Sequence, residues 1–314
     1  MPTETNDFHI VHEALVQYYG RLVPSIGNYE LLVLHAQVHR ASCVEVRGIL
    51  QGENWRTWYK GLPEILLHAA THDYFKRVSD LFRIGVRPGI LGIGTPLFNF
   101  LCDRQKVDMA RLFVAEGRAL DDISLDQKLE LLHGNVIFNR IQTVDFLVRE
   151  CNINVSDAGA SGDNALVIAV QHKHIDMLEL LLTHSERIDM LCGGQTLLHL
   201  CLRTRASHDM IRMLLQHGAN PEILDHQNVS PLHLAVQYNS LDMVNALLDG
   251  GADINRVNDT GGNTALHVAV NHGFIAMSRL LQIRGADVDV VNAQGQTART
   301  IAIKWNLVPI LEFL

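Results

Sequence analysis

The sequence lacks the features that mark several large classes of protein. Lys and Arg are scattered singly rather than gathered into a basic stripe, and the formal net charge is −8. Because nucleic-acid binders neutralise phosphates with Lys and Arg, this charge argues against a general nucleic-acid binder. No run of residues approaches the ~18 apolar positions that a membrane span needs. The polar, acidic start, Met1–Asp7, is the reverse of a secretory signal peptide.

The chain has few cysteines, and their spacing matches no paired motif. The chain has 5 cysteines (Cys43, Cys102, Cys151, Cys192 and Cys201), an odd number without a C-x-x-C pair. This pattern is typical of reduced thiols in a cytosolic compartment. We therefore expect a soluble, cytoplasmic protein.

A repeated segment is the strongest feature that the sequence does contain. The run Ser230–Ala235 (SPLHLA) returns as Thr264–Ala269 (TALHVA), and Asp249–Asn255 (DGGADIN) returns as Ile283–Asp289 (IRGADVD), each 34 positions later. Self-similarity at such a period indicates a solenoid of stacked units. A solenoid presents an extended binding surface rather than an enclosed pocket.

Each unit is expected to be a pair of short helices. Leu232 and Val236 recur at helical spacing, and Leu241, Val244 and Leu248 form the apolar stripe of a second helix. One such pair cannot cover its own apolar face, so it needs a neighbour on each side. The position of Leu232 can be followed through about nine units; the residues at this position are Leu32, Leu66, Leu97, Leu131, Leu166, Leu198, Leu232, Leu266 and Arg299.

These motifs resemble the ankyrin repeat family, whose unit opens with T-P-L-H-x-A and closes with G-A-D-x-N. The match is closest at Ser230–Ala235 with Gly251–Asn255. The resemblance implies an all-α solenoid of helix-turn-helix units with projecting turns. It also implies that His199, His233 and His267 hydrogen-bond the neighbouring turn. Arg299, Val167 and Ser185-Glu186 depart from the pattern.

The regularity of the repeats suggests three segments. Residues 1–27 do not fit the period and are predicted to form a capping helix, 28–157 hold degenerate repeats, and 158–314 hold repeats close to the family pattern. The last residues, Ile310–Leu314, are apolar, whereas a terminal unit ordinarily has a polar outer face. We expect either that the chain is truncated or that this end docks onto another surface. Unless the apolar C-terminus docks in this way, the protein should be a monomer.

No pattern in the sequence predicts an enzyme, a metal site or a cofactor. His172 and His174 share a helix start, but positions i and i+2 point to different faces and no Cys or Glu completes a site. Gly89, Gly92 and Gly94 do not follow a strand, so they predict a turn and not a phosphate loop.

The surface left free for a partner consists of the projecting turns and the exposed side of each first helix, which together should line a concave groove. Within this surface, Tyr238 and Trp305 are the candidate anchors, because aromatic residues carry much of the energy of interfaces. We expect a scaffold or recognition protein that binds another protein, with no nucleic acid or membrane as ligand. The predicted contact residues are Arg203, Thr204, His226, Gln227, Val229, Gln237, Tyr238, Asn263, Asn271, His272, Gln296, Lys304 and Trp305.

Two other roles remain open. Leu62–Leu67 (LPEILL) resembles the start of an F-box, which would make the chain a substrate adaptor of a ubiquitin ligase. Leu66, Ala69 and Ala70 fit the repeat register equally well. The chain could also be the recognition part of an effector that a bacterium delivers into the host cytosol.

Overall fold

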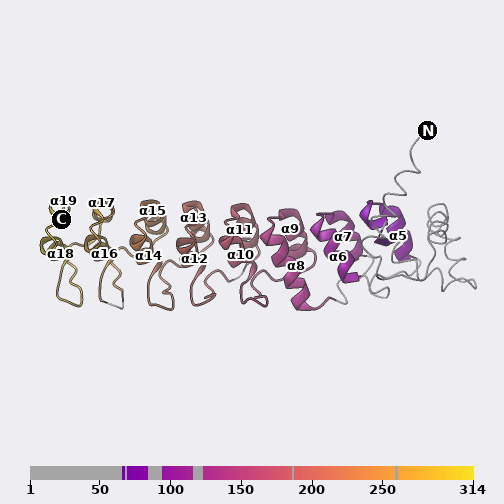
Figure 1. Ribbon diagram of the computed structural model, residues 1–314, viewed down its shortest axis with the longest axis horizontal. Helices are drawn as coiled ribbons and strands as arrows, with labels where there is room; N and C mark the ends of the chain where they lie inside the picture. Colours follow the sequence, from indigo (N-terminus) through magenta and orange to yellow (C-terminus); the bar gives the residue numbers. More distant parts are fainter. Residues whose placement is uncertain (1–65, 68, 84–93, 116–122, 186, 259–260) are drawn as a thin grey trace, which may run out of the picture. The chain divides into compact units, whose positions relative to one another are not determined.

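The computed structural model describes residues 66–83, 94–115 and 123–314, apart from 68, 186 and 259–260 (Figure 1). The chain divides into two compact units, Met1–Ser124 and Leu125–Leu314. The predicted capping helix at 1–27 and the predicted unit around Leu32 lie outside the described residues.

The described elements are helices that alternate between two positions in each repeat. In the first unit they are α5 (Phe75–Arg83), α6 (Gly94–Asp103) and α7 (Val107–Ala115). In the second they are α8 (Leu125–Ile137), α9 (Ile141–Arg149), α10 (Ala165–Gln171), α11 (Ile175–Leu182), α12 (Leu197–Arg203), α13 (His208–Gln216), α14 (Pro231–Gln237), α15 (Leu241–Asp249), α16 (Ala265–Asn271), α17 (Ile275–Ile283), α18 (Ala298–Lys304) and α19 (Val308–Leu311).

Several of the first helices begin at a side-chain cap. The side chains of Asn164, Ser230 and Thr264 accept a hydrogen bond from the backbone N–H three residues on, which satisfies one of the free donors of a helix start. The helix then ends before a residue of positive φ, which turns the chain into the second helix. These turn residues are Asp73, Gln105, Asn139, Lys173, Arg205, Asn239, Gly273 and Asn306.

This left-handed residue fixes the register of every repeat. It follows Leu166, Leu198, Leu232 and Leu266 by seven positions (for example, 239 − 232 = 7). The same spacing from Gln105 and Asn139 leads back to Phe98 and Leu132, one residue beyond the predicted Leu97 and Leu131. All four side chains are buried, so the apolar pattern alone does not separate the two registers.

In the second unit, successive repeats bury one another. The first helices α10, α12, α14, α16 and α18 each contact the next, and each packs on the second helix of its own repeat. In α10 and α16, all six residues that precede the last are buried. Figure 1 shows the two helical layers, with the connecting loops projecting from the side of the first helices. This arrangement confirms the helical repeat fold, because each repeat buries apolar side chains that a single pair of helices could not cover alone.

Leu66 and Leu67, which belong to the segment resembling an F-box, are helical, and their side chains are buried with those of Ala69 and Ala70. The described cysteines Cys102, Cys151, Cys192 and Cys201 are free thiols. None of the helices in the described ranges is long and apolar enough to cross a membrane.

Candidate partner-binding surface

Histidines tie each of three first helices to the loop of the following repeat. The ring of His233 is buried, with Nδ1 at 2.7 Å from Ser230 Oγ and Nε2 at 2.9 Å from the carbonyl oxygen of Asn263. His199 and His267 make the same two contacts, His199 with Thr196 and Val229, and His267 with Thr264 and Gln296. The structural role predicted for the three histidines is confirmed.

These contacts fit a neutral imidazole. Nε2 donates its proton to the carbonyl oxygen, and in the neutral ring Nδ1 then accepts from the hydroxyl of the cap residue. Burial favours the same form: it lowers the pKa of His199, His233 and His267 below the ordinary value of 6.5, despite the opposing effect of the hydrogen bond to the carbonyl.

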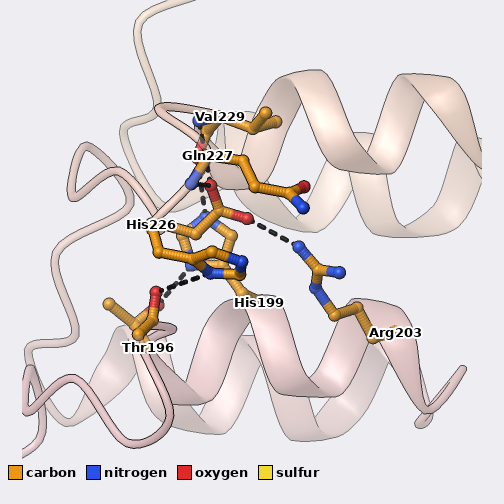
Figure 2. Close-up of polar contacts among 8 residues, drawn as sticks. Thr196, His199, Arg203, His226, Gln227 and Val229 are labelled. Atoms are coloured by element: carbon orange, nitrogen blue, oxygen red, sulfur yellow. Dashed lines mark hydrogen bonds and ion pairs between the residues drawn. The ribbon is translucent and has the colours of Figure 1, made fainter.

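A buried carboxylate organises the loop before α14 (Figure 2). Oδ1 of Asp225 accepts hydrogen bonds from the backbone N–H groups of Gln227 and Val229, at 2.9 and 3.0 Å. Oδ2 accepts from Nη2 of Arg203 at 2.6 Å, and the side chain of Asp225 is fully buried. Burial raises the pKa of Asp225, but the hydrogen bonds from Val229, Gln227 and Arg203 outweigh it and hold that pKa below its usual value.

Neighbouring loops are joined directly. The backbone N–H of His226 donates to the carbonyl oxygen of Gly194 at 2.7 Å, in the preceding loop. Gly194 has φ +77°, and a Cβ there would lie 2.9 Å from Cβ of His226, so this contact requires glycine. Between the loops that precede α16 and α18, Asn292 Nδ2 donates to Asn263 Oδ1 at 2.9 Å. The tips of these two pairs of adjacent loops are therefore joined by hydrogen bonds, and we call the tips of the loops before α14, α16 and α18 the loop edge.

The beginnings of the loops are joined as well. The backbone N–H of Asp253 donates to Glu222 Oε1, and that of Asp287 donates to Asn255 Oδ1, at 2.9 and 2.8 Å. Arg256 Nη1 lies 2.6 Å from Glu222 Oε2. The side chains of Glu222 and Asn255 are therefore already engaged in holding one repeat against the next.

A second edge is formed where the first helices end. We call it the recognition row: in each repeat, the last residue of the first helix, the residue that caps it, and the left-handed residue that follows. Most of these side chains are exposed. The row consists of Ile137–Asn139, Gln171–Lys173, Arg203–Arg205, Gln237–Asn239, Asn271–Gly273 and Lys304–Asn306.

The structure divides the predicted contact residues between the two edges, and none of them is buried. Seven of the eight on the recognition row are exposed and Thr204 is half-buried; the eight are Arg203, Thr204, Gln237, Tyr238, Asn271, His272, Lys304 and Trp305. On the loop edge, His226 and Gln227 are exposed, whereas Val229, Asn263 and Gln296 are half-buried.

Several of these residues already have a structural partner. The carbonyl oxygens of Val229, Asn263 and Gln296 receive the histidines of the preceding repeat. Arg203 is paired with Asp225, and His272 Nδ1 lies 2.9 Å from the carbonyl oxygen of Val268. The side chains left with the most freedom to meet a partner are those of Gln227, Gln237, Tyr238, Asn271 and Trp305.

Sequence reasoning missed two apolar members of the recognition row. Ile137 and Phe138 are 40% and 69% exposed, and Arg140 lies over the ring of Phe138 at 4.9 Å. They hold the positions that Gln237 and Tyr238 hold three repeats later, at the end of α14. Counting from Leu132 instead of Leu131 would have found them, because Phe138 then falls where Tyr238 falls after Leu232.

The acidic, histidine and cysteine side chains of the described residues are dispersed. Across the described residues, His, Cys, Asp and Glu nowhere gather in a group of three or more that could hold a metal ion. The rings of His172 and His174 stack at 5.7 Å, and His174 Nε2 lies 3.0 Å from the carbonyl oxygen of Ile137. This pair belongs to the recognition row and its turn.

Comparison with known proteins agrees with the fold. A family model for ankyrin repeats, in three copies, matches residues 132–225, 187–258 and 232–314, more than half of the chain. The chain belongs to the ankyrin repeat family. Ankyrin repeats act as protein–protein interaction modules, and this chain is such a module.

The similar proteins are diverse. An ankyrin repeat protein of fowlpox virus is 35% identical over 121 residues, which cover 37% of this chain and 35% of the viral protein. Human ankyrin repeat and SOCS box protein 16 is 34% identical over 90 residues, covering 29% and 20% of the two chains. The crystal structure of the ankyrin repeat domain of Bcl-3, of the IkappaB family, has a TM-score of 0.60 and 26% identity, and covers 68% of this chain and 97% of that one. The chain thus spans about a third or less of these curated relatives.

Proposed function

We propose that this ankyrin repeat chain recognises a protein partner through the loop edge and the recognition row of the repeats between α12 and α18. The contacts would come from the exposed polar side chains Gln227, Gln237 and Asn271, with Tyr238 and Trp305 as anchors. The observation that carries the proposal is the contrast between the two aromatic side chains, 40% and 57% exposed, and the buried, hydrogen-bonded scaffold that holds them.

Preorganisation supports this assignment. The loop edge is fixed by the histidine bridges and by the buried Asp225, so little conformational freedom would be lost when a partner binds. Tyr and Trp add a large contact area with few rotatable bonds, which is why they dominate the energetics of interfaces.

The test is a charged double substitution, Tyr238→Glu with Trp305→Glu. A partner would first be identified by affinity purification of the full chain and mass spectrometry, and then purified. In calorimetry with that partner, the double variant should lose at least tenfold in affinity, since removing a single interface anchor costs about 2 kcal/mol or more. Its melting curve should match that of the unchanged protein, because both side chains are exposed.

A matched control lies on the second helix α17. Ile275 and Ile283 are 46% and 70% exposed there, so Ile275→Glu with Ile283→Glu makes the same change of charge on another face. This control should bind the partner normally. Unchanged binding by the Tyr238 and Trp305 variant, or an equal loss in the control, would show that the partner uses a different surface.

A further inference from the structure

The cations of the second unit fall into two groups. Several arginines are neutralised by a carboxylate of the chain, as Arg203 of α12 is by Asp225. The other pairs are Arg149–Asp145, Arg212–Asp209, Arg256–Glu222 and Arg284–Asp249, with N–O distances from 2.5 to 3.9 Å. Lys173 and Arg205 are exposed and form no ion pair with any described residue.

Lys173 and Arg205 occupy the same position in consecutive repeats. Each is the left-handed residue of the recognition row, after α10 and after α12, and these two helices are in contact. The exposed side chain of His172 lies next to Lys173. No position of the recognition row from α8 to α18 holds a carboxylate, although the chain as a whole carries more acids than bases.

The backbone at these two positions is not one that Lys and Arg favour. Lys173 has φ +59° and Arg205 has φ +50°, values that suit glycine and asparagine better than long side chains. The equivalent turns after α8, α14, α16 and α18 use Asn139, Asn239, Gly273 and Asn306. The two cations therefore add positive charge to the surface at a cost in local backbone energy.

We propose that Lys173 and Arg205 form a cationic site that binds an acidic, extended segment of the protein partner. This inference rests on the proposed function, since it extends the same recognition row from the aromatic anchors toward α10. Two adjacent repeats each present one cation that has no carboxylate partner. Successive Asp or Glu side chains of the bound segment would contact these two cations. The remaining residues of the segment would lie over Tyr238. Complementary charge of this kind gives specificity and fast association.

The acidic groups near the site do not already neutralise it. Asp176 and Asp209 follow the two cations in the first turns of α11 and α13, where the helix dipole stabilises them. Asp209 contacts Arg212 and His208 instead. Asp163, in the loop before α10, accepts a hydrogen bond from Nε2 of Gln171 at 3.3 Å. None of the three forms an ion pair with Lys173 or Arg205.

The experiment uses random peptides displayed on phage and selected on the immobilised full chain. The strongest peptide would then be measured by fluorescence anisotropy against four proteins: the unchanged chain, Lys173→Asn with Arg205→Asn, Tyr238→Glu with Trp305→Glu, and a control, Lys128→Gln with Arg187→Gln. The control removes the same charge at two other cations that form no ion pair with a described residue. An RNA homopolymer serves as a second polyanion.

We expect the selected peptides to be rich in Asp and Glu, and their binding to weaken with added salt. The Lys173 and Arg205 variant should bind about tenfold less tightly while the control binds normally, because two charge-assisted contacts are lost. Its melting temperature should be equal or higher, since asparagine suits the left-handed turn better. A side chain with only a structural role would not give this combination of weaker binding and retained stability.

Other results would overturn the inference. Peptides without acidic enrichment, no enriched peptide at all, or an equal loss in the control would each do so. So would RNA binding that depends on Lys173 and Arg205 as strongly as peptide binding does. Peptides that need Tyr238 and Trp305 but not the two cations would leave the proposed function standing and refute only the cationic site. Peptides that need neither pair would refute both.

Discussion

The buried carboxylate of Asp225 allows a sharp prediction, because two substitutions remove different parts of its contacts. Asp225→Asn keeps an oxygen that can accept from the backbone N–H groups of Gln227 and Val229, as Asn292 does for the loop before α18. It loses only the ion pair with Arg203. Asp225→Ala loses the ion pair and both backbone contacts.

The two costs follow from the environment. The Arg203 side chain is 31% exposed, so its attraction to Asp225 is partly screened and its loss should cost about 1 kcal/mol. Each backbone hydrogen bond adds roughly 1 kcal/mol, and more where the freed N–H stays buried. We therefore expect Asp225→Asn to lower the free energy of unfolding by about 1 kcal/mol and Asp225→Ala by about 2–4 kcal/mol.

Urea unfolding measures both values, and hydrogen exchange at the amides of Gln227 and Val229 shows where the stability is lost. Arg203→Ala alone should match Asp225→Asn, and the two together should cost little more than either, because they remove one interaction. Equal costs for Asp225→Asn and Asp225→Ala, or a cost under 1 kcal/mol for Asp225→Ala, would refute the role of the carboxylate as the organiser of this loop.

The pH dependence gives the same prediction a second readout. The pKa of Asp225 is lower in the folded chain than its ordinary value of 3.8. A lowered pKa means that the ionised form contributes stability above the unfolded value, and that this contribution is lost as the pH falls through the folded value. The difference in stability between the unchanged chain and Asp225→Asn should therefore shrink below about pH 4.

Two further predictions concern the scaffold. Leu232→Ala should lower the free energy of unfolding in urea by about 2–5 kcal/mol, because Leu232 is 2% exposed between neighbouring repeats; a change near zero would show that the register is wrong. The pKa of His199, His233 and His267 is lowered by burial, so their contribution to stability is complete above about pH 6.5 and is lost as the pH falls below it. Calorimetry should show a melting temperature that falls from pH 7.5 to 5.5, and less steeply in a His233→Leu variant; a flat or rising profile would contradict the neutral bridge.

The fold could be predicted from the sequence because the same buried and hydrogen-bonding residues recur in several repeats. Leu232 and Leu266 are both buried, and His233 and His267 make equivalent bridges, so two copies confirm each interpretation. The register failed by one residue where two apolar residues stand together, at Leu97-Phe98 and Leu131-Leu132. Because both residues of each pair are buried, the hydrophobic pattern does not distinguish the two registers. The left-handed turn residue cannot settle the register from the sequence either, since it is not glycine in these repeats.

The sequence could predict which residues lie on the candidate surface, but not which of them form ion pairs within the chain. Arg203 was predicted to be a contact residue because it falls on the exposed side of a first helix, and it is exposed in part. Its carboxylate partner lies 22 residues ahead in a loop whose path depends on the tertiary structure. In the same way, the sequence identifies Lys173 and Arg205 as cations, but only the backbone shows that both occupy a left-handed turn in adjacent repeats.

The corrected register also places His133 at the position of the bridging histidines, where its bridge is incomplete. Its Nε2 is buried without a hydrogen-bond partner, and burial lowers its pKa. The carbonyl oxygen of Asp163 lies thirty residues ahead, as the acceptors of His199 and His233 do, and it accepts from the N–H of Gly159. A Cβ at Gly159 would lie 2.8 Å from the ring, so glycine makes the space that the ring occupies. An unsatisfied buried donor costs about 1–3 kcal/mol, which weakens this part of the array.

The repeat that holds Val167 shows what a histidine bridge contributes. The carbonyl oxygen of Gln195, which no histidine reaches, still accepts from the N–H of Cys192 at 2.9 Å. The acceptors of the complete bridges likewise keep a local donor: Asp225 N–H donates to Val229, and Asn292 N–H to Gln296. The histidine is therefore not needed to satisfy a buried carbonyl group, and its effect is to tie each loop to the helix before it. The tied loops are those that carry the predicted contact residues of the loop edge, so the rigid part of the scaffold and the proposed binding surface coincide.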